Sequence, residues 1–154
     1  MSNPAPALPV LWDKPLAGTP FRGLILRTHY CYCAYIGVPQ DHWLADMQEL
    51  QFECHWGVNF REPGDGGLRP AGWFWYGWDY GHAGDQTFLL QSMPPELAEM
   101  LPEGLKRHLG AGKSWTLAEI EQDLIDAAVS LAHAMARADH ASNAALRASV
   151  TRQS

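Results

Sequence analysis

Residues 72–85 read GWFWYGWDYGHAGD, and this stretch combines aromatic rings, glycines and three ionisable side chains. Aromatic residues favour strands, so residues 73–80 are expected to form one. Because side chains alternate across a strand, Trp73 and Trp75 should share one face and Trp78 should lie on the other. The glycines after this strand indicate a turn.

Two segments upstream also carry strand patterns. Residues 21–35 mix aliphatic and aromatic side chains, which predicts one or two strands with a break near residues 37–39. Residues 50–60 alternate between apolar and polar side chains, which predicts another strand. The apolar face of that strand would hold Phe52, Cys54, Trp56 and Val58.

The segments between these predicted strands contain residues that are typical of helix caps and turns. Asp41 is expected to cap a short helix that runs to residue 50. Residues 61–72 are rich in glycine and proline, which predicts a long loop. This loop would join the strand 50–60 to the strand 73–80 as an antiparallel hairpin.

Helical patterns follow the strand patterns. Pro94 and Pro95 can begin a helix over residues 96–100, and Pro102 separates it from a second helix over residues 105–109. A longer helix is predicted after Thr116, which has capping-box spacing to Glu119. Its apolar face consists of Leu117, Ile120, Leu124, Ala128, Leu131 and Met135.

The predicted fold class is α+β, with a small antiparallel sheet and a long C-terminal amphipathic helix packed on one face. At 154 residues and 47% hydrophobic side chains, the chain fits one domain with its own core. That domain is expected over residues 21–138, after an irregular, Pro-rich lead-in at residues 1–20. Residues 139–154 should either extend the helix or fray.

Charge and cysteine content narrow the classes of partner. The net charge of −6 comes without a Lys/Arg cluster, which argues against binding to a nucleic acid polymer. A local site for an anionic small molecule stays open, because net charge describes the whole surface. The sequence has no signal-peptide pattern, no membrane-spanning run and only three cysteines. We therefore expect a cytoplasmic protein without a membrane partner, and the oligomeric state is left open.

The strongest candidates for chemistry lie at the end of the strand 73–80. Asp79, His82 and Asp85 fall within one short turn segment. A histidine beside a carboxylate is held in one tautomer, as general acid–base catalysis requires. If the protein is an enzyme, these are its expected catalytic residues. The alternative is that they only bond the local backbone.

Four further side chains are candidates for ligand binding. Trp75 and Trp78 could stack on an aromatic ring, and core packing is the alternative for each. Arg61 and Arg69 could hold a phosphate or carboxylate group, and solvated loop charges are the alternative.

Two more histidines could extend the site. His42 and His55 could join Asp79 or Asp85 in binding a ligand or a divalent metal ion. The sequence contains no compact metal-binding motif. No cofactor is therefore predicted, and a divalent metal is kept as an alternative.

Several blocks of this sequence resemble a family of small uncharacterised proteins encoded by phages and by bacteria that carry prophage-like genes. The most specific block is the Asp-x-x-His-Ala-Gly-Asp sequence at residues 79–85, at the end of a Trp-rich segment. The other blocks are residues 33–39, His42, residues 55–60, and Trp115 with the helix after it.

The chain departs from the family pattern at three positions. Ala34 and Trp56 stand where the pattern has glycine, and Tyr80 stands where relatives often have cysteine. A mechanism that needs a cysteine nucleophile beside Asp79 is therefore excluded for this chain.

Three hypotheses for the function follow. The resemblance implies a phage-type accessory protein, which could bind a small polar aromatic ligand and sequester a nucleotide immune signal. The second hypothesis is a hydrolase of a phosphodiester that uses His82 with Asp79 or Asp85. The third is a protein-interaction module that docks a host factor through exposed tryptophans.

Overall fold

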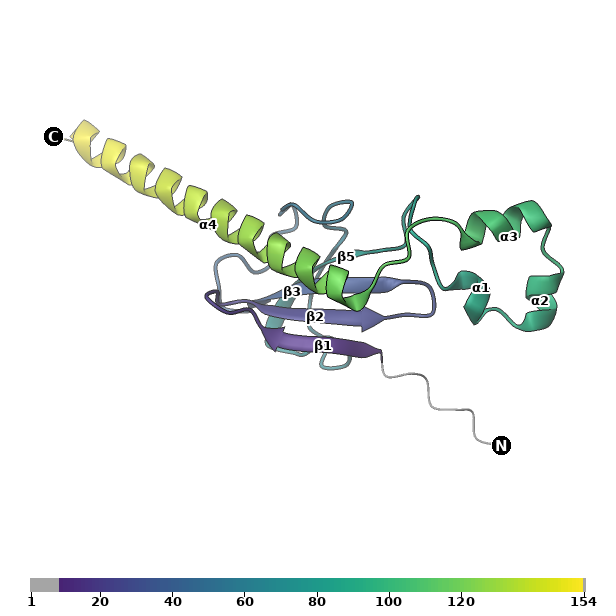
Figure 1. The fold of residues 1–154 in the computed structure, drawn as a ribbon. Coiled ribbons are helices and arrows are strands. Elements are labelled where there is room, and N and C mark those ends of the chain that lie inside the picture. The colour runs from purple at the N-terminus through teal and green to yellow at the C-terminus, as the bar shows by residue number, and fades with distance from the viewer. Residues whose placement is uncertain (1–8, 154) are drawn as a thin grey trace.

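The computed structural model describes residues 9–153, and it describes side chains for residues 9–138. It confirms the α+β fold, in which the long helix α4 (Leu117–Gln153) crosses one face of an antiparallel sheet (Figure 1). The sheet has the order β1-β2-β3-β5-β4. Its strands are β1 (Val10–Pro15), β2 (Arg22–Arg27), β3 (Tyr32–Pro39), β4 (Phe60–Pro63) and β5 (Trp73–Asp79).

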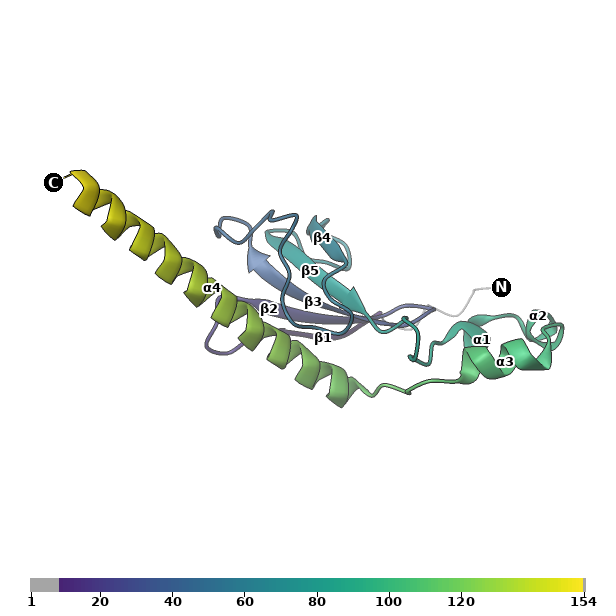
Figure 2. The same ribbon diagram turned by 90° about the horizontal axis from the view of Figure 1, so that it is seen from above.

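Three short helices between β5 and α4 form an arm at one end of the sheet. They are α1 (Leu89–Ser92), α2 (Pro95–Glu99) and α3 (Glu103–Gly110), and none of their residues is buried. Figures 1 and 2 show this arm beyond one end of the sheet, while α4 leads away toward the other. The helices predicted around Pro95 and after Pro102 are confirmed, whereas α1 had no recognised sequence signal.

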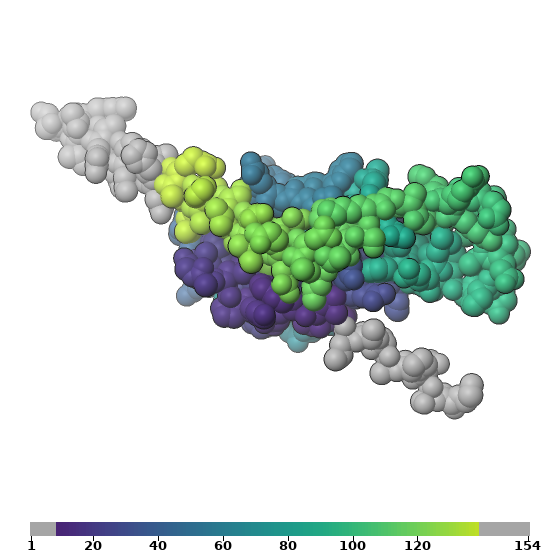
Figure 3. All heavy atoms as spheres, viewed as in Figure 1, coloured from purple at the N-terminus to yellow at the C-terminus, as the bar shows by residue number. Residues whose placement is uncertain are grey.

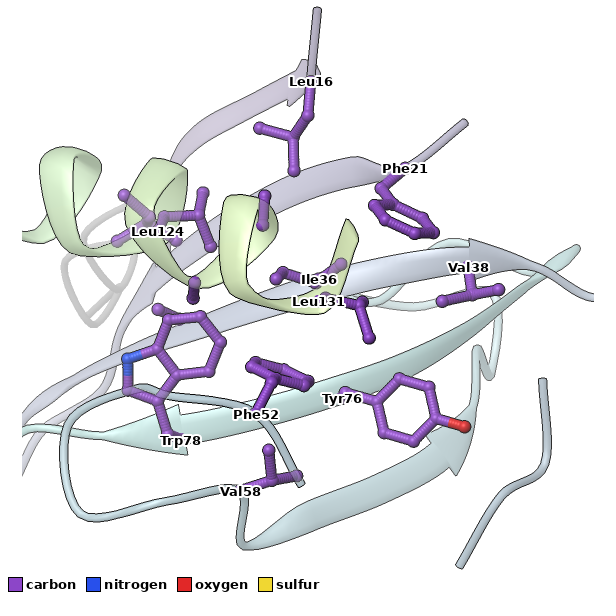
Figure 4. Packing of buried hydrophobic residues seen from close by; sticks show 14 of the residues in the cluster. Leu16, Phe21, Ile36, Val38, Phe52, Val58, Tyr76, Trp78, Leu124 and Leu131 are labelled. Atoms are coloured by element: carbon purple, nitrogen blue, oxygen red, sulfur yellow. The ribbon is translucent and has the colours of Figure 1, made fainter. Parts of the chain in front are cut away.

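The main core lies between the sheet and the first half of α4. Ile120, Leu124 and Leu131 are fully buried, which confirms the predicted apolar face of this helix. Figure 4 shows Leu124 and Leu131 beside Ile36 of β3 and Trp78 of β5, in one continuous apolar cluster. The space-filling view shows the same first turns of α4 lying directly against the strands (Figure 3).

The start of α4 is fixed by the predicted capping box. Thr116 Oγ1 accepts a hydrogen bond from Glu119 N at 3.2 Å, and Glu119 Oε1 accepts one from Thr116 N at 3.1 Å. Lys113 Nζ lies 2.7 Å from Glu119 Oε2, which ties the preceding segment to the helix. The position of Trp115, between Lys113 and the cap, is therefore set by the helix start.

On the opposite face of the sheet, two aromatic rings each pack over a glycine of the neighbouring strand. Trp75 of β5 is the strand partner of Gly37 in β3, and Tyr35 of β3 is the partner of Gly77 in β5. A Cβ atom would lie 2.7 Å from the Trp75 ring at Gly37 and 2.5 Å from the Tyr35 ring at Gly77. The rings therefore fill the space that the glycines leave, and they lock β3 to β5.

The predicted loop between β4 and β5 covers this second face. Residues 64–72 form it, and Trp75 Nε1 donates a hydrogen bond to Pro70 O at 3.0 Å. The antiparallel pairing of the predicted hairpin is confirmed, but its first strand consists of residues 60–63, and residues 61–63 had been predicted to lie in the loop.

The prediction of a strand over residues 50–60 was wrong for residues 50–59, and residues 51–59 form a loop. Trp56 and Gly57 have φ angles of 62° and 80°, which a strand does not allow. The Gln51 side chain replaces a partner strand, since its amide both donates to Val58 O and accepts from Val58 N at 2.9 Å. Phe52 and Val58 are buried as expected, but the backbone between them turns.

Two further local predictions were wrong. Asp41 does not cap a helix, because residues 41–50 form successive turns, such as the one closed by Ala45 N and His42 O at 2.9 Å. The expected break near residues 37–39 is absent, since β3 continues to Pro39.

The lead-in predicted to be irregular contains an edge strand, β1, while residues 1–8 lie outside the described part. Its pairing with β2 is reinforced by Arg22, whose Nε and Nη2 donate to Asp13 at 2.7 Å each. Pro15 ends the strand, which is where a sheet tolerates proline.

The glycine and ring pairs can be tested by adding one methyl group. Gly77→Ala is expected to lower the free energy of unfolding by about 1–3 kcal/mol, because the new Cβ would clash with the Tyr35 ring. Gly104→Ala in α3 is the control, since a Cβ there has no atom within 4 Å. Urea unfolding compares the two variants, and equal stabilities would show that the ring contact does not constrain the sheet.

Candidate functional site

Four of the predicted site residues converge at the end of β5. His55 from the loop 51–59 meets Asp79, His82 and Asp85, and we call these four residues the paired-histidine site. They form two histidine–aspartate pairs, His55 with Asp85 and His82 with Asp79. The two imidazole centroids are 6.2 Å apart, and the ring planes are tilted by 60°.

The first pair is built around a buried carboxylate. His55 Nε2 lies 3.0 and 2.8 Å from the two oxygens of Asp85. Asp85 also accepts hydrogen bonds from Trp115 Nε1 at 2.8 Å and from His82 N at 3.0 Å. Burial alone would raise the pKa of Asp85, but these hydrogen bonds outweigh it and hold the pKa below its usual value.

The charge of Asp85 decides the proton arrangement on His55. An ionised carboxylate only accepts hydrogen bonds, so His55 Nε2 must carry the proton between them. No hydrogen bond from a side chain of residues 9–138 reaches His55 Nδ1. His55 Nδ1 is therefore the ring nitrogen that can still accept a proton or, when the ring is charged, donate a hydrogen bond.

Two aromatic rings fix the plane of the His55 imidazole. Tyr80 stacks on it at 4.8 Å and 10°, and Trp115 meets it edge-on at 5.0 Å. The Tyr80 hydroxyl accepts from Trp78 Nε1 at 3.1 Å and donates to Asp123 of α4 at 2.9 Å. Burial raises the pKa of Tyr80, so its hydroxyl stays protonated and keeps this link between β5 and α4.

The second pair is less completely bonded. His82 Nε2 lies 3.3 Å from Asp79 Oδ1, outside hydrogen-bond geometry, and this buried nitrogen has no other partner among the described residues. Asp79 itself is fixed by Asn59 Nδ2 at 2.8 Å and by Gly81 N at 3.0 Å. The second pair is therefore held by its aspartate side, while the histidine keeps a buried nitrogen without a hydrogen bond.

The outer side of His82 is covered by an exposed tryptophan. Trp56 stacks on the His82 imidazole at 4.8 Å and 13°, and it remains 62% exposed. Its φ of 62° is unusual for a bulky residue and costs about 1–2 kcal/mol. The alternating pattern had placed Trp56 on an apolar face with Phe52 and Val58, so its outward position is a correction.

A hollow of about 280 Å³ opens beside His82, between the turn 81–85 and residues 108–112 of the arm. The two walls are joined by backbone hydrogen bonds, Lys113 N to Gly84 O at 2.8 Å and Gln86 N to Lys113 O at 2.9 Å. Gly112 has a φ of 103°, and a Cβ there would lie 2.7 Å from Gly84 O. This close approach requires glycine, and it keeps the hollow directly next to the paired-histidine site.

Three aromatic residues predicted for the site lie elsewhere. Trp75 and Trp78 are buried on opposite faces of the sheet, which confirms their alternation but removes them as exposed stacking surfaces. His42 follows the end of β3 that pairs with Trp73, whereas Asp79 pairs with the other end of β3. His42 instead stacks on Trp43, and its Nδ1 accepts from Leu44 N at 3.1 Å.

The two predicted arginines also serve the fold. The Arg61 guanidinium donates to Leu50 O at 2.9 and 3.1 Å, so it fixes the start of the loop 51–59. Arg69 lies over the Phe60 ring at 4.5 Å on the second face of the sheet. Neither arginine belongs to the paired-histidine site.

Four contributors to the site were not assigned to it from the sequence, namely Trp56, Asn59, Tyr80 and Trp115. Trp56 was expected on an apolar face, and Trp115 was named only as part of a block before the long helix. The signal that could have linked Trp115 to the turn is the resemblance, whose blocks include both. Asn59 and Tyr80 carry no signal of their own in one sequence.

Among residues 9–138, no group of three or more His, Cys, Asp or Glu side chains has the arrangement of a metal site. No helix in the described part of the chain is long and apolar enough to cross a membrane. Cys31, Cys33 and Cys54 are free thiols.

Comparisons with protein-family models, with curated proteins and with solved structures gave no match.

The buried Asp85 carboxylate predicts a specific pH dependence of stability. The pKa of Asp85 is lower in the folded chain than in the unfolded chain, so its contribution is complete above the unfolded value of about 3.9. It is lost as the pH falls through the folded pKa. Asp85→Asn should lower the free energy of unfolding at pH 7 by about 1–3 kcal/mol.

Urea unfolding at pH 7 and at pH 3 tests this dependence. The wild-type protein should lose more stability on acidification than Asp85→Asn, because the variant has already lost the titrating group. Asp41→Asn, at an exposed position, should behave as the wild type. An Asp85→Asn profile parallel to the wild type would refute the assignment.

Proposed function

We propose that this protein binds a small phosphate-bearing ligand at the paired-histidine site. One observation carries the proposal, namely that two imidazoles, each beside its own aspartate, lie with centroids 6.2 Å apart. A charged imidazole has two N–H donors, so it can bond its aspartate through one and a ligand oxygen through the other. Two such donors side by side suit the several oxygens of a phosphate group.

The surroundings favour a small ligand. The hollow beside His82 has room for a phosphate and its attached group, at about 280 Å³. The net charge of −6 supplies no extended basic surface for a phosphate polymer. The resemblance to phage-associated proteins extends the proposal to a biological role, in which the ligand is a nucleotide signal of bacterial defence that is held without being cleaved.

Hydrolysis of a phosphodiester is the second candidate function, and the His55 environment favours it. Asp85 fixes the proton on His55 Nε2 and leaves Nδ1 as the acceptor, which is the arrangement of a general base. His82, beside Asp79, could then protonate the leaving group. The expected reaction is attack of water on phosphorus, with a proton passing to His55 and another passing from His82 to the departing oxygen.

Binding can be tested by calorimetry with inorganic phosphate, AMP, ADP-ribose and cyclic AMP as probes. His55→Ala and His82→Ala should each weaken binding of the phosphate-bearing probes by about tenfold or more, because each removes a charge-assisted hydrogen bond. His133→Ala, at an exposed position on α4, is the matched control and should leave binding unchanged. Binding that survives both site substitutions would rule out this site.

Turnover distinguishes the two candidate functions. Phosphorus NMR of cyclic AMP and ADP-ribose incubated with the protein should show no new phosphate species if the ligand is only held. Product formation that disappears in His55→Ala, while calorimetry still detects binding, would instead establish the hydrolase. This substitution removes the base but leaves His82 to contact the ligand.

A further inference from the structure

We propose that Trp56 is the stacking surface for a flat aromatic ring of the ligand. The site would then select nucleotides over phosphate esters that lack an aromatic ring. This inference rests on the proposed function and specifies its ligand class. It also replaces Trp75 and Trp78 as the aromatic surface, because both of those rings are buried.

The fold gains little from a tryptophan at position 56. The side chain is 62% exposed and belongs to neither apolar cluster of the protein. Its backbone adopts φ 62°, where glycine is favoured and a bulky residue is strained. A residue that is both strained and exposed points to a functional role, since packing does not account for it.

The loop holds the Trp56 ring in a defined place. Gly57 N donates to Cys54 O at 3.1 Å, and the Gln51 amide closes the base of the loop on Val58. Glu53 N donates to Ser130 Oγ of α4 at 3.1 Å, which anchors the loop to the helix. A ring in a fixed position loses little entropy when a ligand stacks on it.

One face of the indole is already used and the other is free. Trp56 lies nearly parallel to the His82 imidazole at 4.8 Å, and no other aromatic ring or cation in the described structure stacks on it. A base on the free face would lie across the indole from His82, so its phosphate would pass the edge of the indole to meet the His82 imidazole. Stacking of this kind tolerates any base, because every base has a π-face.

A second exposed tryptophan provides a matched comparison. Trp43 is 50% exposed and stacks on His42 at 5.8 Å, but it lies at the opposite end of the β3–β5 pair. Its backbone has no positive φ, and no aspartate pairs with His42 in the described structure. Trp43 is therefore exposed and contacts a histidine, as Trp56 does, but it lies away from the paired-histidine site.

The experiment compares each nucleotide with a sugar phosphate that lacks the aromatic base. Calorimetry measures AMP, ADP-ribose and cyclic AMP against ribose 5-phosphate, for the wild type, Trp56→Gly, Trp56→Phe and Trp43→Ala. Trp56→Gly should weaken nucleotide binding about tenfold or more and leave ribose 5-phosphate unchanged. Trp56→Phe should restore most of the loss, and Trp43→Ala should match the wild type.

Glycine suits φ 62°, so Trp56→Gly should fold at least as stably as the wild type, and thermal unfolding verifies this. Equal binding of nucleotides and ribose 5-phosphate by the wild type would overturn the Trp56 inference while the phosphate site stands. The same conclusion would follow if Trp56→Gly weakened both ligands equally, because the indole would then only position His82. Failure of every probe to bind the wild type would overturn the proposed function as well.

Discussion

The carboxylate of Asp85 joins three segments that are distant in the sequence. It is buried, and it accepts hydrogen bonds from His55 in the loop 51–59, from the backbone of His82 and from Trp115 before α4. A buried charge is tolerated only when its hydrogen-bonding capacity is filled, so the three donors must arrive together. The bridge between Asp85 and Lys113 also closes the base of the α1–α3 arm. The sheet, the start of α4 and the arm therefore meet at the Asp85 carboxylate. The hydrogen bonds that this carboxylate accepts also bring the residues of the candidate site together.

The glycine and ring pairs between β3 and β5 explain which aromatic residues remain free for a ligand. Gly37 and Gly77 admit the rings of Trp75 and Tyr35 into the sheet surface, while Trp78 packs under α4 on the other face. The rings of Trp75 and Trp78 in β5 are therefore buried in the core and are not available to a ligand. Beyond the strand, Tyr80 stacks on His55, and the loop 51–59 exposes the indole of Trp56 beside the paired-histidine site. The division of rings between core and surface is thus a consequence of strand pairing.

The parts of the fold that depend on local sequence could be predicted. The spacing of Ile120, Leu124 and Leu131, the capping box and the helix-starting prolines are all local signals, and each is confirmed. The turn that gathers Asp79, His82 and Asp85 is equally local. The loop 51–59 could not be predicted, because Phe52 and Val58 are buried in it just as in a strand, and the Gln51 clamp is visible only in three dimensions. The positive φ at position 56 has no local signal either, because tryptophan rarely adopts it.

The two histidine–aspartate pairs differ in how completely they are formed, and the difference suggests a division of roles. His55 is fixed by two carboxylate contacts and two flanking rings, so it is preorganised for its partner. His82 has a buried Nε2 without a hydrogen bond, which is costly and leaves its ring able to realign against Asp79. Because Trp56 stacks on that ring, the position of the indole and the orientation of the His82 imidazole depend on each other. The first pair is therefore completed by the fold itself, whereas the second pair keeps a hydrogen-bonding nitrogen without a partner among the described residues.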